Sequence, residues 1–343
     1  MKLKLEYIYV AAIVISILQL IVFFTNLEYD VEGWGKNSLR NLSNYVSEVN
    51  FQIIPYDFCQ KPGMLLIFVC SAPQNAEARQ AVRETWGSNK VVLNENVELL
   101  FFLGNSLNAS VQEAVLIESE KFNDIIQADF SDSYYNLTIK STLMLQLVSN
   151  KCLDKYKFFF KIDDDMFVNL PKLVKVLKEQ NSSENVLLGK MMCGTKPIKD
   201  PTSKWYCPTY MYNGTYFPNF LSGTGYVMSM DVTRKLYNSA MTIPFIHLED
   251  VYFTGLCAQR SGITPNTLFE FSTGYVDDNS CDINHLITMH YVTPEKMRNV
   301  YQRIQQPEFL GKCSQYKSVF EPIAWIRSTL FIPPARWKRK RIC

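Results

Sequence analysis

Short apolar runs alternate with amphipathic stretches along most of the chain. The runs at residues 64–70 and 99–103 have the length and composition of buried strands. Residues 76–86 and 136–150 repeat apolar side chains at helical spacing, and Asn75 stands where the first of these helices would have its N-cap. Strands that alternate with helices predict an α/β fold built around a mostly parallel central sheet.

The first residues of the chain follow a different pattern. Residues 7–24 carry no charged side chain and approach the ~20 residues that a helix needs to cross a bilayer. Lys2 and Lys4 precede this run and acidic residues follow it, which predicts a signal-anchor whose N-terminal side stays in the cytosol. A cleaved signal peptide is disfavoured, because no A-x-A-like site follows the run. We therefore expect a cytosolic tail (1–6), a transmembrane signal-anchor (7–24), a polar stem (25–58) and one lumenal domain (59–343).

Composition narrows the choice of partners and compartment. Lysine and arginine number 35 against 33 aspartate and glutamate, so the chain lacks the basic excess that grips nucleic acid, and we expect no nucleic-acid partner. Nine cysteines suit an oxidising compartment, although the sequence leaves their pairing open. N-glycosylation sequons point to the same compartment, and they stand at Asn41, Asn108, Asn136, Asn181 and Asn213.

Three consecutive acids are the strongest local signal of chemistry. Asp163, Asp164 and Asp165 directly follow the apolar run at 156–162. Ligands of open α/β sheets bind outside the carboxyl ends of strands. Three adjacent carboxylates repel one another unless a cation neutralises them, and oxygen ligands suit Mg²⁺ or Mn²⁺. This pattern predicts a divalent-metal site, with a solvated acidic turn as the alternative.

A candidate helix carries Arg79, Arg83 and Trp86 at positions i, i+4 and i+7, which lie on one helical face. Two guanidinium groups and an indole suit a diphosphate or a nucleobase. The alternative is a surface helix in which arginine pairs with glutamate and the tryptophan packs inward.

Two further candidates are weaker when each is taken alone. Glu249 and Asp250 stand at the expected start of a helix that ends near Gly262, and the helix dipole by itself would favour acids there. His290 ends the apolar run at 286–290, and a lone histidine is more often structural than a ligand.

Taken together and in this order, these segments resemble the β-1,3-galactosyltransferase and β-1,3-N-acetylglucosaminyltransferase family of Golgi type II membrane enzymes. The similarity covers residue 59 to about residue 299, and the β-1,3-galactosyltransferases are the members most closely resembled. It rests on ARQAVRETWG (78–87), FFLG (101–104), DIIQADFSDSYYNLTIKS (124–141), KIDDDMFVN (161–169), PIKD followed by SKWY (197–206), SGTGYVMS (222–229), HLEDVYFTGLC (247–257) and ITMHYVTPEKM (287–297).

The resemblance implies a GT-A fold, a nucleotide-sugar-binding α/β domain. It also implies Mn²⁺, with Mg²⁺ as the substitute, and inverting transfer of galactose from UDP-galactose in β1,3 linkage. The acceptor would be a sugar of a glycoprotein or glycolipid at the Golgi membrane. Alternatives are UDP-N-acetylglucosamine as the donor, a non-catalytic lumenal chaperone or lectin on the same fold, and a metal-dependent phosphohydrolase.

Roles for individual residues also follow from the resemblance. Asp250 matches the catalytic base, and Asp163, Asp165 and His290 match the metal site. Donor-side positions are Arg79, Arg83, Trp86, Asp163, Asp164, Gly223 and Gly225. Positions lining the acceptor cleft are Lys204, Trp205 and Glu249. Cys257 and Cys281 occupy positions that suggest a disulfide.

Overall fold

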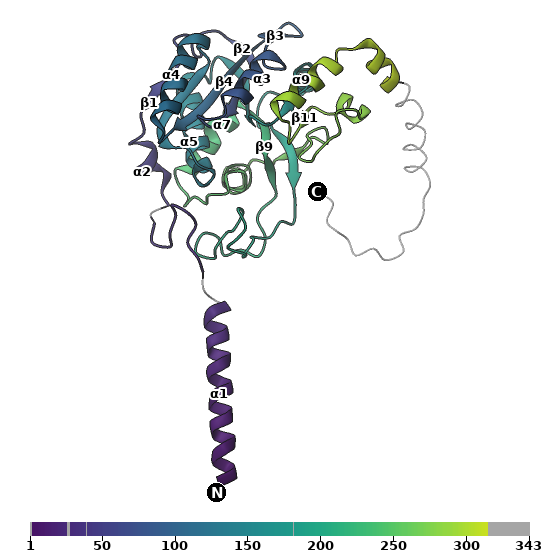
Figure 1. Cartoon of the computed structure of the whole chain (residues 1–343). Helices are drawn as coiled ribbons and strands as arrows, with labels where there is room; N and C mark the ends of the chain where they lie inside the picture. The colour runs from purple at the N-terminus through teal and green to yellow at the C-terminus, as the bar shows by residue number, and fades with distance from the viewer. Residues whose placement is uncertain (1, 26–27, 39, 181, 315–343) are drawn as a thin grey trace. The chain divides into compact units, whose positions relative to one another are not determined.

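The computed structural model describes residues 2–25, 28–38, 40–180 and 182–314 (Figure 1). The chain forms two compact units, one from residues 1–39 with 197–214 and a larger one from 40–196 with 215–343. The larger unit holds the central sheet and most of the site residues predicted from the sequence.

The central sheet has the strand order β1-β5-β4-β2-β6-β9-β8-β10, and β3 pairs with β4. The four strands β5, β4, β2 and β6 are parallel, whereas β9 is antiparallel to both β6 and β8. This arrangement confirms the α/β class and fits a GT-A-like fold. The strand bounds are β1 (Phe51–Ile53), β2 (Gly63–Cys70), β3 (Val91–Val92), β4 (Glu95–Asn105), β5 (Ile125–Ser131), β6 (Tyr156–Asp163), β8 (Leu187–Met192), β9 (Phe220–Ser229) and β10 (Asn266–Thr267).

Helices pack on both faces of the sheet, because its central strands bury alternate side chains in opposite directions. Residues 65, 67 and 69 of β2 join the core formed with α3 (Ala76–Glu84), α4 (Ala109–Phe122), α6 (Leu170–Lys178) and α9 (Pro294–Arg303). On the opposite face Phe68 stacks against Phe102, and Cys70 Sγ lies 4.0 Å from Met144 Sδ of α5 (Leu137–Lys151). Helix α7 (Met230–Ala240) packs against α5, and α3 lies beside α9 (Figure 1).

The folded unit begins earlier than the sequence predicted. Helix α2 (Leu42–Val46) and strand β1 both fall within residues 25–58, the predicted stem. Leu42 and Val46 are buried, and β1 pairs with β5 at the edge of the sheet. Few apolar side chains make these contacts, so the polar composition of the segment hid them.

The smaller unit contains helix α1 (Lys2–Thr25) and the segment 197–214. Val31 and Trp34 are buried, and the Tyr210 hydroxyl donates to the Trp34 carbonyl at 2.9 Å. Within the described part of the chain, no helix combines the length and the hydropathy that crossing a membrane requires. The signal-anchor over residues 7–24 therefore stays a prediction.

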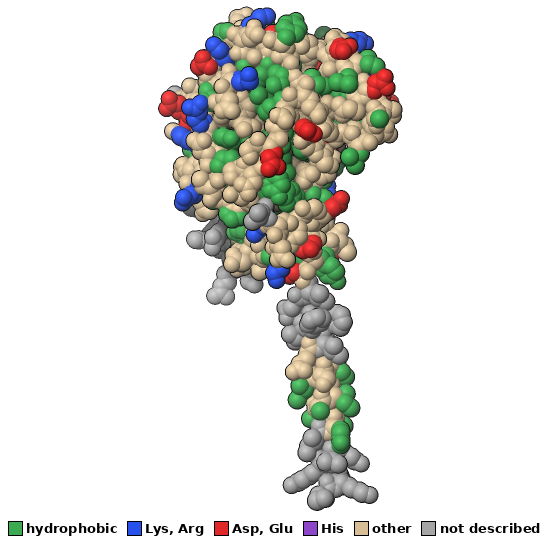
Figure 2. All heavy atoms as spheres, turned by 90° about the vertical axis from the view of Figure 1, so that its left-hand side faces the viewer, with side chains coloured by type: hydrophobic (Ala, Val, Ile, Leu, Met, Phe, Trp, Pro, Cys, Tyr) green, Lys and Arg blue, Asp and Glu red, His purple; other side chains and the backbone are tan. Residues whose placement is uncertain are grey.

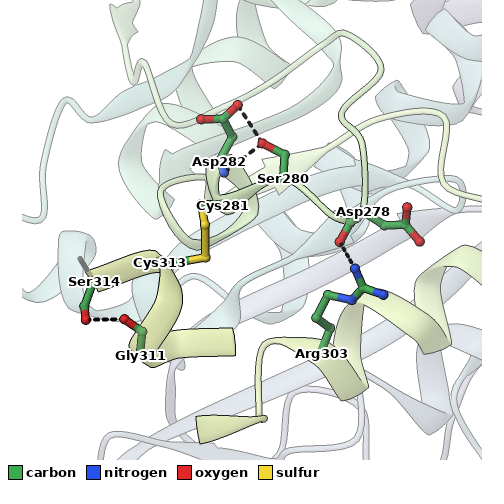
Figure 3. The surroundings of a disulfide bond; sticks show 8 residues. All are labelled: Asp278, Ser280, Cys281, Asp282, Arg303, Gly311, Cys313 and Ser314. Atoms are coloured by element: carbon green, nitrogen blue, oxygen red, sulfur yellow. Dashed lines mark hydrogen bonds between the residues drawn. A yellow bond between two sulfur atoms is a disulfide. The ribbon is translucent and has the colours of Figure 1, made fainter. Parts of the chain in front are cut away.

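The structure describes two disulfide pairs of the larger unit, both between described residues, and neither is the predicted one. Cys59 pairs with Cys152, and Cys281 pairs with Cys313 beyond the end of α9 (Figure 3). The pairing expected between Cys257 and Cys281 is wrong, because Cys257 is a free, fully buried thiol. It ends the π-helix η2 (Val251–Cys257), whose side chains pack into the core, whereas Cys281 begins the short helix η3 (Cys281–Asn284).

The surface carries both signs of charge. On the face shown in Figure 2, lysine and arginine side chains are interspersed with aspartate and glutamate. Of the predicted glycosylation sites, Asn41, Asn108 and Asn213 are exposed and Asn136 is half-buried at the start of α5. Asn181 lies outside the described residues.

Candidate active site

The side chains of Asp165 and His290 meet because two short strands bring their ends together. Strand β7 (Phe167–Val168) pairs antiparallel with β11 (Thr288–Met289). Asp165 Oδ2 consequently lies 3.2 Å from His290 Nε2. The other ring nitrogen, Nδ1, is 3.1 Å from the Thr273 carbonyl oxygen, which can only accept, so Nδ1 carries a proton.

Burial alone would lower the pKa of His290, but the hydrogen bond to Asp165, the charge of that carboxylate and smaller contributions from the Thr273 carbonyl and Asp163 together outweigh burial and raise the pKa. A nitrogen and a carboxylate oxygen so placed are suitable ligands for a divalent cation, which would take the place of the proton between them. In the described residues no three or more of His, Cys, Asp and Glu gather as a complete metal site. Two protein ligands nevertheless suit an ion whose remaining ligands are water and the phosphates of a substrate.

Asp164 points toward helix α3 instead of toward His290. Its Oδ2 accepts hydrogen bonds from Ser71 Oγ at 2.7 Å and from Asn75 Nδ2 at 2.9 Å. Asn75 occupies the N-cap position of α3 as predicted, yet its side chain bonds Asp164 and makes no capping bond to the helix. The β2–α3 connection therefore holds this carboxylate in place.

Asp163 faces strand β9 through a buried lysine. Lys161 Nζ lies 2.8 Å from Asp163 Oδ1, 2.6 Å from the Gly223 carbonyl oxygen and 3.8 Å from Glu249 Oε2. The Tyr226 hydroxyl donates to the other oxygen of Glu249. Burial raises the pKa of Asp163 to about 6, although Lys161 opposes the rise. The three acids are thus held by three different sets of partners, which rules out a simple solvated turn.

Lys161 is a site residue that sequence reasoning did not single out. A charged side chain inside an apolar strand is costly unless it is paired. The position of Lys161 in the run at 156–162 could therefore have indicated that it pairs with an acid. Oδ1 of Asp163 accepts from Lys161, which leaves Oδ2 as the oxygen with which Asp163 would bind a metal.

Asp250 stands directly before η2 and is held by backbone groups. Its Oδ2 accepts from the Gly223 amide at 3.1 Å and its Oδ1 from the Val251 amide at 2.8 Å. The sequence predicted a helix dipole that favours the ionised form. Instead, burial and the neighbouring Glu249 raise the pKa of Asp250 to about 6, although both amide bonds oppose the rise. The carboxylate is thus ionised near neutral pH yet basic enough to accept a proton.

Glu249 is less suited than Asp250 to act as a base. It is only 5% exposed and is engaged by Tyr226 and Lys161, whereas Asp250 is partly exposed. The predicted acceptor-cleft position of Glu249 thus corresponds to a buried carboxylate that neutralises Lys161.

A glycine on β9 gives Asp250 its space, which leads to a first prediction. A Cβ at Gly223 would lie 3.2 Å from Asp250 Cβ and 3.4 Å from its Oδ2. We expect Gly223→Ala to shift this carboxylate and lower the turnover number by about 10- to 100-fold, since small misplacements of reacting groups have effects of this size.

Gly225→Ala is the matched control on the same strand. The resemblance places Gly225 on the donor side, but its Cβ would meet the buried side chains of Ile162 and Phe160 at 3.3 Å, away from Asp250. Gly225→Ala should therefore lower the melting temperature and spare turnover. Turnover and thermal unfolding of both variants decide the matter. An equal loss of turnover in the two would contradict a specific role for Gly223.

Arg79 lies beneath the site and not on its surface. Its guanidinium is fully buried and donates to both oxygens of Glu118, at 2.8 and 2.6 Å. It also donates to Ser71 Oγ at 3.1 Å and to the carbonyls of Ala72 and Pro73. These bonds occupy all five N–H donors, so we correct the predicted donor contact of Arg79 to a positioning role through Ser71.

The other two residues of the predicted helical face are also structural in their contacts, and Trp86 lies beyond the end of α3 at Glu84. Arg83 bonds Glu118 at 2.7 Å and Asp124 at 2.8 Å, and its guanidinium lies over the Phe122 ring. Trp86 is buried and donates from its indole nitrogen to the Met166 carbonyl at 3.1 Å. Trp86 therefore cannot stack on a nucleobase without leaving the core, but it does anchor the backbone next to Asp165.

Lys140 is a second buried lysine that sequence reasoning missed. Its Nζ donates to the Ser71 carbonyl at 2.6 Å and pairs with Asp132 at 2.8 Å. Because Ser71 also bonds Arg79 and Asp164, both buried cations support the end of β2.

Lys204 and Trp205 belong to the smaller unit, whereas the site residues described above belong to the larger one. Within that unit the Lys204 ammonium lies 4.8 Å from the centre of the Trp205 ring, and Trp205 is 50% exposed. Their place in an acceptor cleft stays a prediction.

Comparison with known proteins agrees with this geometry. Residues 77–268 match the protein family described as Galactosyltransferase. The chain is 37% identical to human beta-1,3-galactosyltransferase 2 over 285 residues, which are 81% of this chain and 66% of the relative. It is 35% identical to mouse beta-1,3-galactosyltransferase 5 over 257 residues (74% and 83%) and 35% identical to mouse beta-1,3-galactosyltransferase 1 over 247 residues (72% and 75%). A partly exposed group of acids at the end of β6, beside β9, and these similarities lead to one conclusion: the chain belongs to the galactosyltransferase family and is a glycosyltransferase.

Proposed function

We propose that this protein transfers galactose from UDP-galactose to a sugar hydroxyl in β1,3 linkage, with inversion at the anomeric carbon. One observation carries the proposal. A partly exposed carboxylate, Asp250, and a separate pair of potential metal ligands, Asp165 and His290, flank the buried Lys161 and its partner Asp163 at the carboxyl end of β6. Inversion by direct displacement requires two such functions, one at the nucleophile and one at the leaving group.

In this proposal the acceptor hydroxyl oxygen attacks the anomeric carbon while the bond to the UDP oxygen breaks. Asp250 receives the hydroxyl proton, which is work that typically contributes 10²–10⁴-fold. Asp165 and His290 would hold a divalent cation, Mn²⁺ or Mg²⁺, which neutralises the charge developing on the diphosphate. Lys161 keeps its ammonium between Asp163 and Glu249, so both acids retain their positions.

The location is part of the same proposal. We place the enzyme in the Golgi membrane as a single-pass type II protein whose catalytic domain faces the lumen and acts on glycoproteins or glycolipids. Two disulfides and exposed sequons at Asn41, Asn108 and Asn213 support an oxidising lumenal compartment.

Full-length protein extracted in detergent tests the proposal directly. Incubated with Mn²⁺, a panel of sugar acceptors and each of two donors, it should transfer galactose from UDP-galactose and should lose this activity when EDTA removes the metal. Transfer from UDP-N-acetylglucosamine alone would reassign the donor. Release of inorganic phosphate without transfer would indicate a phosphohydrolase, and neither product would favour a non-catalytic role.

A further inference from the structure

Tyr291 holds a backbone conformation that is unfavourable for its side chain. Its φ is +58°, in the left-handed region that bulky residues rarely adopt. Such strain persists where the surrounding structure imposes it, and it is frequent at ligand-binding sites. The ring is nevertheless 57% exposed, so burial of the side chain does not explain the conformation.

The phenol ring of Tyr291 lies against the proposed metal ligand. Its centroid is 3.8 Å from that of the His290 imidazole, and the two planes are inclined by 27°. Since the imidazole covers one face of the phenol, the exposed surface is the other face and the ring edge. The left-handed turn therefore presents an aromatic face beside the Asp165–His290 pair.

Tyr291 also lines a cavity of about 520 Å³, whose other lining residues include Gln74, Asn75, Ala78, Asp164 and Asp165. Both hydrogen bonds from Ser71 and Asn75 reach Oδ2 of Asp164. In the part of the chain that the structure describes, its Oδ1 accepts no hydrogen bond and can accept one from a ligand hydroxyl. The cavity thus combines a flat aromatic wall, a hydroxyl acceptor and an edge at the metal ligands.

The position of this cavity indicates which part of the substrates binds in it. Asp163 faces β9 and Asp250 through Lys161 and Gly223, whereas Asp164 faces α3. In an inverting displacement the nucleophile and the leaving group lie on opposite sides of the reacting carbon. A cavity on the Asp164–Asp165 side, away from Asp250, therefore belongs to the leaving nucleotide and not to the acceptor sugar.

We propose that the exposed face of Tyr291 stacks on the base of the nucleoside diphosphate sugar and that its strained backbone serves to place the ring there. This inference rests on the proposed function and adds a donor-binding residue to it. An aromatic face stacks on any planar base, and the Asp164 carboxylate would accept a hydrogen bond from a ribose hydroxyl.

Tyr291→Gly removes the ring and leaves a residue that adopts the same backbone conformation, so it tests the ring by itself. Glycine adopts a positive φ without strain, so the variant should fold and unfold at a melting temperature no lower than that of the native protein. We expect its KM for the UDP-sugar and the inhibition constant of UDP to rise by about 5- to 100-fold, the range for loss of one base–aromatic stack. The inhibition constant of Mn²⁺-pyrophosphate, which has no base, should not change, and Tyr291→Phe should keep native affinity for UDP.

Several outcomes would overturn the inference. One is an unchanged inhibition constant of UDP, and another is an increase confined to the KM of the acceptor. A third is an equal increase in the inhibition constants of UDP and pyrophosphate, which would place the effect at the metal site. Tyr291→Asn, which also tolerates a positive φ, repeats the test if the glycine variant does not fold. Absence of transfer by the native protein would instead refute the proposed function, while UDP binding to native protein and variants would still test the stack.

Discussion

Asp250→Asn is expected to reduce transfer by about 10²-fold or more while leaving the affinities for UDP and Mn²⁺ nearly unchanged. Asparagine keeps the size of the side chain and one oxygen that can accept from the Gly223 or Val251 amide. What it loses is the capacity to take the proton of the acceptor hydroxyl. Initial rates at saturating donor, together with calorimetric titration of UDP, measure the two quantities separately.

The pH dependence of the native enzyme provides a second measurement of the same base. Burial and Glu249 raise the pKa of Asp250 to about 6, so the carboxylate is mostly ionised at pH 7 and becomes protonated as the pH falls. Because only the ionised form accepts a proton, the rate should fall about tenfold per pH unit below pH 6. A rate that stayed constant from pH 7 to pH 5 would argue against Asp250.

Glu249→Gln is the matched control, since it removes the adjacent carboxylate and also keeps the shape. Glu249 is engaged by Tyr226 and lies 3.8 Å from Lys161 Nζ, so this variant should lose stability more than turnover. An active Asp250→Asn with an inactive Glu249→Gln would make Glu249 the base. Activity in both folded variants would place the base elsewhere.

Asp165→Ala is expected to abolish transfer and metal-dependent UDP binding together. The cation would connect Asp165 and His290 to the diphosphate, so loss of one of two protein ligands removes both effects at once. Native protein should gain thermal stability from UDP with Mn²⁺, by about 2.7 kcal/mol at one hundred times Kd, and the variant should gain almost none.

Asp154→Ala is the control for this experiment, because its side chain is 78% exposed and its only described ion pair is with the neighbouring Lys155. It should keep native activity and native stabilisation by UDP with Mn²⁺. If Asp165→Ala lost transfer but kept metal-dependent UDP binding, Asp165 would have to be moved out of the metal site.

Local patterns were sufficient to predict the main elements and the position of the site in the fold. The apolar runs at 64–70 and 99–103 lie in β2 and β4, and the amphipathic stretch at 136–150 forms α5. Their periodicity reflects burial on each element, which is a property of adjacent residues. The three acids stand at the end of β6, whose last residue is Asp163, where the sheet leaves side chains accessible to a ligand.

Partner choice was decided only by the tertiary structure. The sequence placed Arg79 and Trp86 on one helical face. It could not show that Arg79 would bond Glu118 and that the Trp86 indole would donate to the Met166 carbonyl. Cys281 meets Cys313 and not Cys257, because the chain beyond α9 folds back onto the η3 segment.

The tertiary structure also decided the different partners of the three acids. Consecutive residues at the end of a strand point in different directions. Asp163 therefore bonds Lys161 of its own strand, Asp164 bonds Ser71 and Asn75 before α3, and Asp165 lies beside His290 after β11. Lys161 on β6 bonds the Gly223 carbonyl of the antiparallel neighbour β9, a pairing that no local pattern encodes. The sequence by itself therefore determined the elements and the chemical groups, whereas long-range packing determined which of those groups are exposed to a substrate and which are neutralised inside the protein.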